Sequence, residues 1–222
     1  GIILISHIDL DTLGGIARAD YDDMMDGQYE SFWQLAAFID INGPHKINSA
    51  NATETDIERL HAYWAWSQAN RGPRRDNTMI HNVTEEVSEH LRAINKILTG
   101  DSELLAAGRK FRDAENNLAE ASYVTSDEAN GITVTLRESN QFVNHLYDDG
   151  LVVVALNNKT KAITLSFAEN IEGLNAADIM QSLFGPLAGG HRNIAGTPRG
   201  IEYTLDDAEK VFATIINILK CK

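Results

Sequence analysis

The chain has 222 residues, 43% of them hydrophobic, and a formal net charge of −13 at pH 7. This length fits one large domain or two small ones, and so acidic a chain should be repelled by long duplex nucleic acid, whose binding depends on neutralising phosphates. No stretch approaches the roughly 18 consecutive apolar residues of a membrane span, and the single cysteine, Cys221, cannot form an internal disulfide. We therefore expect a cytoplasmic protein without a membrane partner.

The first half is expected to be a short strand followed by helices. Residues 2–6 form an almost wholly apolar run, which is typical of a strand buried on both faces. Thr53 and Asp56 resemble a capping box, which marks the start of a helix. Apolar side chains recur at helical spacing in four stretches, at residues 30–40, 54–71, 83–98 and 102–121.

The pattern changes after residue 125. Residues 125–131 are polar and end in glycine, as a linker or turn would. Apolar residues then alternate with threonine over 132–136, which indicates a strand. The remaining expected elements are a β-hairpin followed by two helices, at residues 151–156 with 162–167, at 175–184 and from Thr204 onward.

These elements predict a fold of the α/β to α+β class with two domains. The N-terminal domain, residues 1–125, should be helix-rich with a short buried sheet. The C-terminal domain, residues 126–222, should be a smaller α+β unit.

A histidine and two aspartates follow the first expected strand at alternate positions. His7, Asp9 and Asp11 would point to one side if the strand continued. Two carboxylates so close repel each other unless a cation compensates, and imidazole with carboxylates suits Mn²⁺, Fe²⁺ or Zn²⁺ better than Ca²⁺. The same residues also fit a structural interpretation, in which Asp11 caps a helix, Asp9 is solvated and His7 belongs to the core.

Three further residues could complete a metal site. Asp40 ends the expected helix at 30–40, and a Gly-Pro turn after it would direct His45. His81 stands just before another helix. The structural alternatives are a helix end with an ordinary turn for the first two and a loop position for His81.

A glycine-rich stretch, AGGHRNIAGTPRG, occupies residues 188–200. Gly189 and Gly190 would let the backbone approach a ligand, and exposed N–H groups in such a turn can hold a phosphate. His191, Arg192 and Arg199 could add charge-assisted hydrogen bonds. The alternative is a tight connection between a strand and a helix.

Both unusual stretches resemble motifs of the DHH/DHHA1 phosphoesterase superfamily. SHIDLDTLGG is similar to its first motif, His-x-Asp-x-Asp, and GGHRNIAG is similar to the Gly-Gly-His-x-x-x-Ala-Gly signature of its C-terminal domain. The resemblance implies that His7, Asp9 and Asp11 bind a two-metal centre, usually manganese. It also implies that the glycine-rich stretch holds the substrate across an interdomain cleft, while a metal-activated water attacks phosphorus.

The sequence departs from this pattern because it has no Asp-His-His triplet. Asp40 with His45 is the nearest analogue, and His81 is a candidate for the missing ligand. Asn144 and His145, between an expected strand and the next apolar run, could contact substrate or could belong to a strand-edge hairpin.

We therefore predict a phosphohydrolase that uses Mn²⁺ or another divalent transition metal, with two ions. Its substrate would be a small nucleotide, a short oligonucleotide or a pyrophosphate-like compound, and a second copy of the chain is a candidate partner. Two alternatives remain open. The chain could be a non-catalytic nucleotide-binding module with a degenerate metal site, or a metalloenzyme with other chemistry.

Overall fold

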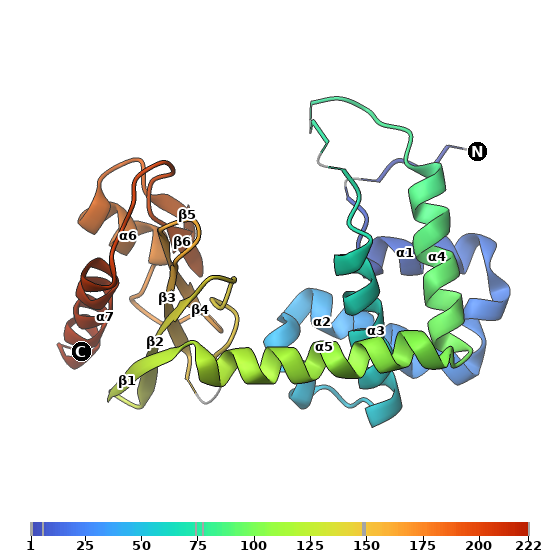
Figure 1. The fold of residues 1–222 in the computed structure, drawn as a ribbon, viewed down its shortest axis with the longest axis horizontal. Helices are drawn as coiled ribbons and strands as arrows, with labels where there is room; N and C mark the ends of the chain where they lie inside the picture. Colours follow the sequence, from blue (N-terminus) through green and yellow to red (C-terminus); the bar gives the residue numbers. More distant parts are fainter. Residues whose placement is uncertain (1, 6, 74, 77, 148–149, 222) are drawn as a thin grey trace. The chain divides into compact units, whose positions relative to one another are not determined.

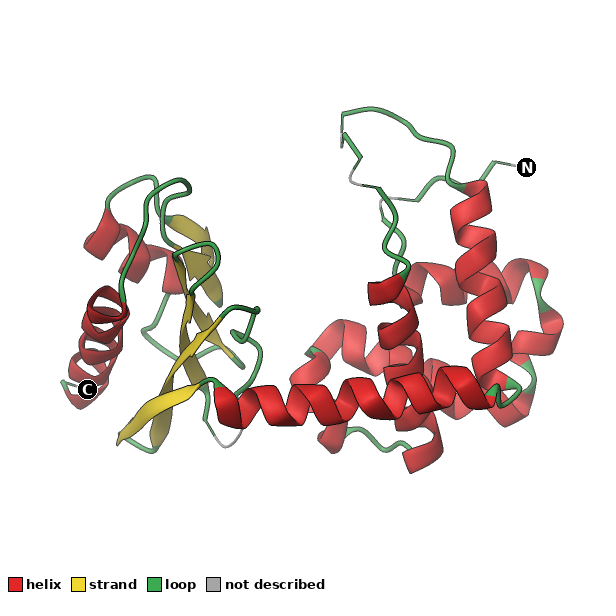
Figure 2. Cartoon of the chain, viewed as in Figure 1, coloured by secondary structure: helices red, strands yellow, loops and turns green. Residues whose placement is uncertain are grey.

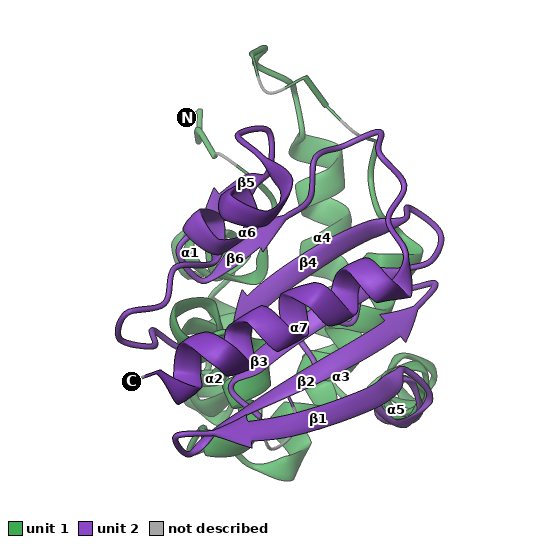
Figure 3. Ribbon diagram, turned by 90° about the vertical axis from the view of Figure 1, so that its left-hand side faces the viewer, with its two compact units in different colours: residues 1–115 green, residues 116–222 purple. Residues whose placement is uncertain are grey.

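The computed structural model describes residues 2–5, 7–73, 75–76, 78–147 and 150–221. The chain forms two compact units, unit 1 over Gly1–Glu115 and unit 2 over Asn116–Lys222 (Figure 3). The division falls inside one continuous helix, α5 (Ser102–Ala121), rather than at residue 125. The predicted fold class is confirmed, since the chain is helix-rich with one mixed sheet (Figures 1 and 2).

All the regular secondary structure in the described residues of unit 1 is helical. Its elements are α1 (Leu10–Asp20), η1 (Asp22–Met25), η2 (Gly27–Tyr29), α2 (Glu30–Asn42), η3 (Pro44–Ser49), α3 (Glu54–Ala69), α4 (Thr84–Leu98) and the first part of α5, where η marks a 3₁₀ turn. The helices expected at 30–40, 54–71, 83–98 and 102–121 are thus confirmed. Apolar side chains from α1 to α4 form one core, in which Leu13, Phe32, Leu60 and Ile94 are almost wholly buried.

The strand predicted at residues 2–6 is wrong. Residues 2–5 are not part of any strand, Ser6 lies outside the described residues, and Ile2 and Leu4 are 91% and 79% exposed. Every strand among the described residues belongs to unit 2. An apolar run becomes a strand only where another strand supplies hydrogen bonds and a covered face, and the described part of unit 1 supplies none.

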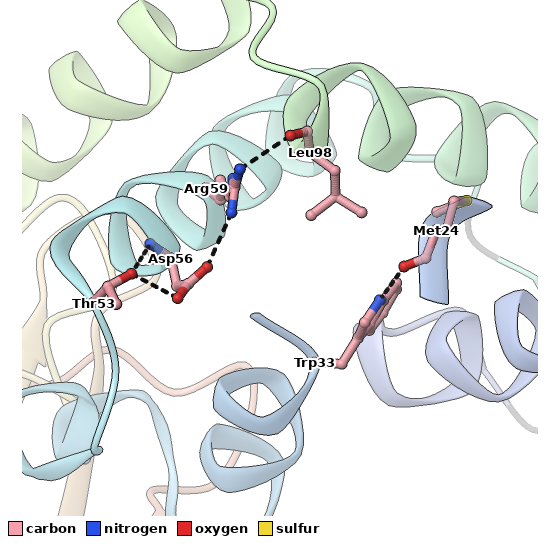
Figure 4. A network of polar contacts seen from close by, with 6 residues as sticks. All are labelled: Met24, Trp33, Thr53, Asp56, Arg59 and Leu98. Carbon is pink, nitrogen blue, oxygen red and sulfur yellow. Dashed lines mark hydrogen bonds and ion pairs between the residues drawn. The ribbon is translucent and has the colours of Figure 1, made fainter. Parts of the chain in front are cut away.

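A polar network ties α3 to α4 in unit 1 (Figure 4). Thr53 caps α3 and donates from its hydroxyl to the buried Asp56 at 2.6 Å, which confirms the predicted capping pair. The Arg59 guanidinium donates to Asp56 Oδ1 and to the carbonyl of Leu98, each at 3.1 Å. The Leu98 carbonyl is at the end of α4, where helix carbonyls need hydrogen-bond donors from outside the helix. The network therefore fixes α3 against α4.

Unit 2 is a six-stranded sheet in the order β1-β2-β3-β4-β6-β5, in which only β2 and β3 are parallel. The helices α6 (Ala176–Phe184) and α7 (Leu205–Lys220) cover one face (Figure 3). The strands are β1 (Tyr123–Ala129), β2 (Ile132–Ser139), β3 (Val152–Asn157), β4 (Ala162–Phe167), β5 (Gly189–His191) and β6 (Ile194–Gly196).

Most of unit 2 agrees with the sequence predictions. The strand at 132–136, the hairpin of β3 and β4 and both helices are confirmed. Residues 125–131, expected as a linker or turn, instead form most of β1 and a two-residue turn at Asn130 and Gly131, both with positive φ. Among the described residues, no helix combines the length and apolar character that crossing a membrane requires.

Candidate functional site

His7 and Asp9 form a pair at the start of α1. Asp9 is the N-cap residue, and its Oδ1 accepts the Thr12 N–H at 2.8 Å while its Oδ2 contacts His7 Nε2. Burial alone would raise the pKa of Asp9, but the hydrogen bonds from Thr12 and the nearby imidazole outweigh it, so this pKa lies below its ordinary value. The Asp9 carboxylate is therefore ionised at neutral pH, with both oxygens engaged.

Asp11 does not point to the same side as Asp9, as it would if both residues belonged to a strand. It lies in the first turn of α1 and is exposed. Neighbours two positions apart on a helix do not face each other, so the expected alternation of His7, Asp9 and Asp11 is lost. The structural alternative was also wrong in detail, because Asp9 rather than Asp11 caps the helix.

The other expected metal ligands lie elsewhere in unit 1. Asp40 is exposed near the end of α2, and His45 is half-buried in η3, with its ring against Gly43. His81 is exposed, and its Nε2 donates to the Asp76 carbonyl at 3.0 Å. Within the described part of the chain, no three His, Cys, Asp or Glu side chains are grouped so as to hold a metal ion.

A buried polar pair near Asp9 was not predicted from the sequence. The Tyr63 hydroxyl of α3 and His90 Nδ1 of α4 are hydrogen-bonded at 2.9 Å, and the Trp66 ring packs edge-on against His90. Burial raises the pKa of Tyr63 above its ordinary value; a hydrogen bond with Ser67 opposes the rise, and the charge of Asp9 adds to it. Tyr63 and His90 occupy core positions of their helices. The sequence pattern around them therefore predicts only that they are packed in the core and does not predict that they contact each other.

The glycine-rich stretch forms the small hairpin of β5 and β6. Gly190 opposes Ala195, and a Cβ on Gly190 would lie 2.3 Å from the Ile194 carbonyl oxygen. Gly190 also has a φ of +156°, which favours glycine. Close strand packing therefore explains this glycine, whereas Gly189 lies beside the Gln181 side chain of α6.

The cationic residues of this stretch are on the surface of unit 2. His191, Arg192 and Arg199 are all exposed. The hairpin is fastened to α6, since the Ala176 N–H donates to the Arg192 carbonyl at 2.8 Å. The backbone that carries Arg192 is therefore held against α6.

Asn144 and His145 lie in a segment between β2 and β3, where both are half-buried. The Asn144 carbonyl accepts a hydrogen bond from the Ser166 hydroxyl of β4. Their predicted contact with substrate stays a prediction, as do the substrate-binding roles of the residues around the β5–β6 hairpin.

Comparison with known proteins identifies a shared fold. No protein-family model and no curated protein matches the chain. A solved structure of PggH, a pGpG-specific phosphodiesterase from Vibrio cholerae, superposes with a TM-score of 0.51 at 12% identity, covering 92% of this chain and 70% of that one. An uncharacterized Helicobacter pylori G27 protein gives a TM-score of 0.28 at 13% identity, covering 92% and 65%. At these identities, the first likeness establishes that the chain has the fold of PggH.

Proposed function

We propose that this chain is a divalent-metal-dependent phosphodiesterase of the DHH/DHHA1 type, acting on a small nucleotide or short oligonucleotide. The observation that carries the proposal is the fold shared with PggH, described as a pGpG-specific phosphodiesterase, over 92% of this chain. The two unusual sequence stretches support it, since one supplies imidazole and carboxylate donors and the other supplies cationic side chains suited to phosphate.

The chemistry of the His7–Asp9 pair fits a divalent transition metal. The imidazole nitrogen contacts the carboxylate oxygen, so both donors could bind one ion that replaced the contact between them. When bound, the metal supplies an activated water and stabilises charge on the phosphoryl oxygens. We propose Asp11, Asp40 and His81 as further metal ligands and His45 as a further catalytic residue. Because these side chains do not form a group with the pair among the described residues, they would have to move toward it.

The surface of the β5–β6 hairpin is the proposed phosphate-binding element. Arg192 and Arg199 supply permanent positive charge, and His191 adds a ring N–H. Gly189 and Gly190 allow the tight backbone on which these side chains stand. Asn144 and His145 are proposed to contact the remainder of the nucleotide.

The test is Mn²⁺-dependent hydrolysis by the parent chain and by Asp9→Asn. Asparagine is as good an N-cap as aspartate, so this variant keeps the bond from Thr12 and removes the charge. The matched control is Asp206→Asn, an exposed aspartate in the first turn of α7. The substrates are pGpG, other di- to pentanucleotides, cyclic dinucleotides and pyrophosphate, with products followed by chromatography.

We expect the parent and Asp206→Asn to hydrolyse at least one of these substrates. Asp9→Asn should fold normally and lose the metal-dependent turnover. Undiminished turnover in Asp9→Asn would remove the His7–Asp9 pair from the mechanism. Nucleotide binding by the parent without any hydrolysis would instead establish a binding module and refute the phosphodiesterase proposal.

A further inference from the structure

Arg137 of β2 has a fully buried side chain, with 0% of its surface exposed. It lies on the sheet face opposite α7, because its neighbour Leu136 packs in the core with α7 and side chains alternate along a strand. This second face is covered by a small apolar cluster. Its members come from β3, from the end of α5 and from the segment after β2: Leu118, Val143, Leu146, Tyr147, Val153 and Ala155.

One guanidinium group joins two segments that are distant in sequence. Arg137 Nε donates to the Leu146 carbonyl at 2.9 Å. Leu146 belongs to the segment of residues 140–147, here named the 140–147 loop. Arg137 Nη1 donates to the Ser122 hydroxyl at 3.0 Å and to the Ala119 carbonyl in the last turn of α5. Carbonyls at a helix end have no partner inside the helix and attract a cation.

The sheet holds the same loop at a second place. The Ser166 hydroxyl of β4 donates to the Asn144 carbonyl and is 2.6 Å from the Tyr147 hydroxyl. Val143 is 1% exposed. The backbone is therefore fixed at Asn144 and at Leu146, on either side of His145.

Burying an arginine is expensive unless its donors are matched to acceptors, and apolar side chains often fill such a space with equal or greater stability. A guanidinium differs from them in geometry, because its rigid fork fixes the directions of several acceptors at once. At Arg137 these acceptors belong to α5, to the residue after it and to the 140–147 loop.

We propose that Arg137 is a positioning residue that couples the 140–147 loop to the C-terminal end of α5. Movement at the end of α5 shifts the position of the Arg137 guanidinium, and this shift moves the backbone next to His145. The inference rests on the proposed function only for the statement that the loop contacts the nucleotide. The coupling itself is a property of unit 2.

Hydrogen–deuterium exchange on the full chain tests the coupling through two amides. The Ser122 N–H bonds to the Leu118 carbonyl at 3.0 Å and reports on the end of α5, and the Leu146 N–H bonds to the Val143 carbonyl at 3.2 Å and reports on the loop. Ser122→Ala removes one acceptor of Arg137 without touching the loop. The matched control is Ser126→Ala in β1, whose exposed hydroxyl contacts Tyr123 instead.

We expect Ser122→Ala to speed exchange at Leu146 by about tenfold, the effect of losing one buried hydrogen bond, with no change in Ser126→Ala. Tyr147→Phe should speed exchange at Leu146 only. Arg137→Met should speed it at both amides, and Arg137→Lys should restore part of the protection, since an ammonium group reaches fewer acceptors. Unchanged exchange at Leu146 in Ser122→Ala would overturn the coupling, even if Arg137→Met fails to fold.

Binding of pGpG supplies the functional measurement. The Kd for pGpG should rise in Ser122→Ala and Arg137→Lys and stay at the parent value in Ser126→Ala. An unchanged Kd in Ser122→Ala, together with faster exchange at Leu146, would show that the loop does not position the nucleotide. Failure of the parent to bind pGpG would count against the proposed function and would leave the exchange test of the coupling intact.

Discussion

Two glycines in helices of unit 1 should respond in opposite ways to the same substitution. Gly108 of α5 is buried where α5 crosses α3, and a Cβ there would lie 2.5 Å from the Ala62 backbone nitrogen and 2.6 Å from its Cα. Gly15 of α1 is exposed, and a Cβ there would meet nothing within 4 Å. Both would gain about 1 kcal/mol of helix propensity on replacement by alanine.

The contacts that an added methyl group would make decide the net effect on stability at each position. Ordinary van der Waals contact begins near 3.4 Å, so α5 and α3 must separate by close to an ångström to admit a methyl group at Gly108. Overpacking of this kind costs about 1–3 kcal/mol, and here the obstacle is backbone, which cannot rotate away. We expect Gly108→Ala to lower the free energy of unfolding by up to about 2 kcal/mol and Gly15→Ala to raise it by about 0.5–1 kcal/mol.

Tryptophan fluorescence during urea unfolding is the appropriate assay, because all three tryptophans, Trp33, Trp64 and Trp66, lie in unit 1. The midpoint should fall for Gly108→Ala and rise for Gly15→Ala, with similar slopes. A stabilised Gly108→Ala variant, matching Gly15→Ala in sign and size, would show that α3 and α5 separate without cost. It would refute the close-packing argument.

Three further substitutions test other parts of the fold. Arg59→Leu leaves the buried Asp56 without its cation and should lower the free energy of unfolding, followed by tryptophan fluorescence, by about 3 kcal/mol. Arg109→Leu, at an exposed pair with Glu58, should lower it by less than about 1 kcal/mol. Equal losses in the two variants would contradict this. Gly190→Ala should open the β5–β6 hairpin and speed amide exchange at Ile194, which pairs with His191 across the hairpin. Gly196→Ala, whose Cβ would be 3.5 Å from its nearest neighbour, should not; protection retained in both would be contrary evidence. The Asp207 carboxylate completes the α7 capping box, and hydrogen bonds from Lys210 and from Thr204 lower its pKa from 3.8 to about 2. A lowered pKa stabilises the fold above pH 3.8 and loses this effect as pH falls through about 2, so Asp207→Ala should lower the melting temperature more at pH 7 than at pH 2; a pH-independent loss would rule out the carboxylate as its source.

The sequence predicted those elements whose local signals agree with their packing. α3 and α7 have capping residues and an apolar face, and β3 and β4 are continuous apolar runs on either side of a turn. β1 escaped prediction because it is an exposed edge strand, in which no alternation of apolar side chains is needed. The prediction of a strand in the apolar run at residues 2–5 failed for the opposite reason. The composition of the run favours a strand, but it does not supply the neighbouring strand that is needed.

The candidate site was only partly predictable. The association of His7 with Asp9 follows from their closeness in the sequence, although its cause is a helix cap rather than a strand face. Tyr63 and His90 are brought together by the packing of α3 on α4, and two residues from different helices leave no joint pattern in one sequence. Gly190 was noticed, but its reason is the opposing backbone of β6 and not a ligand.

The two edges of the sheet in unit 2 bear on aggregation. An unpaired edge strand is a template on which another chain can add its own strand. On one edge, β1 carries the exposed carboxylates of Asp127 and Glu128 at successive positions, one on each face of the sheet. On the other, β5 is three residues long and begins with two glycines. An incoming strand would meet charge repulsion at the first edge and too few hydrogen bonds at the second, so both edges discourage growth of the sheet from one molecule to the next.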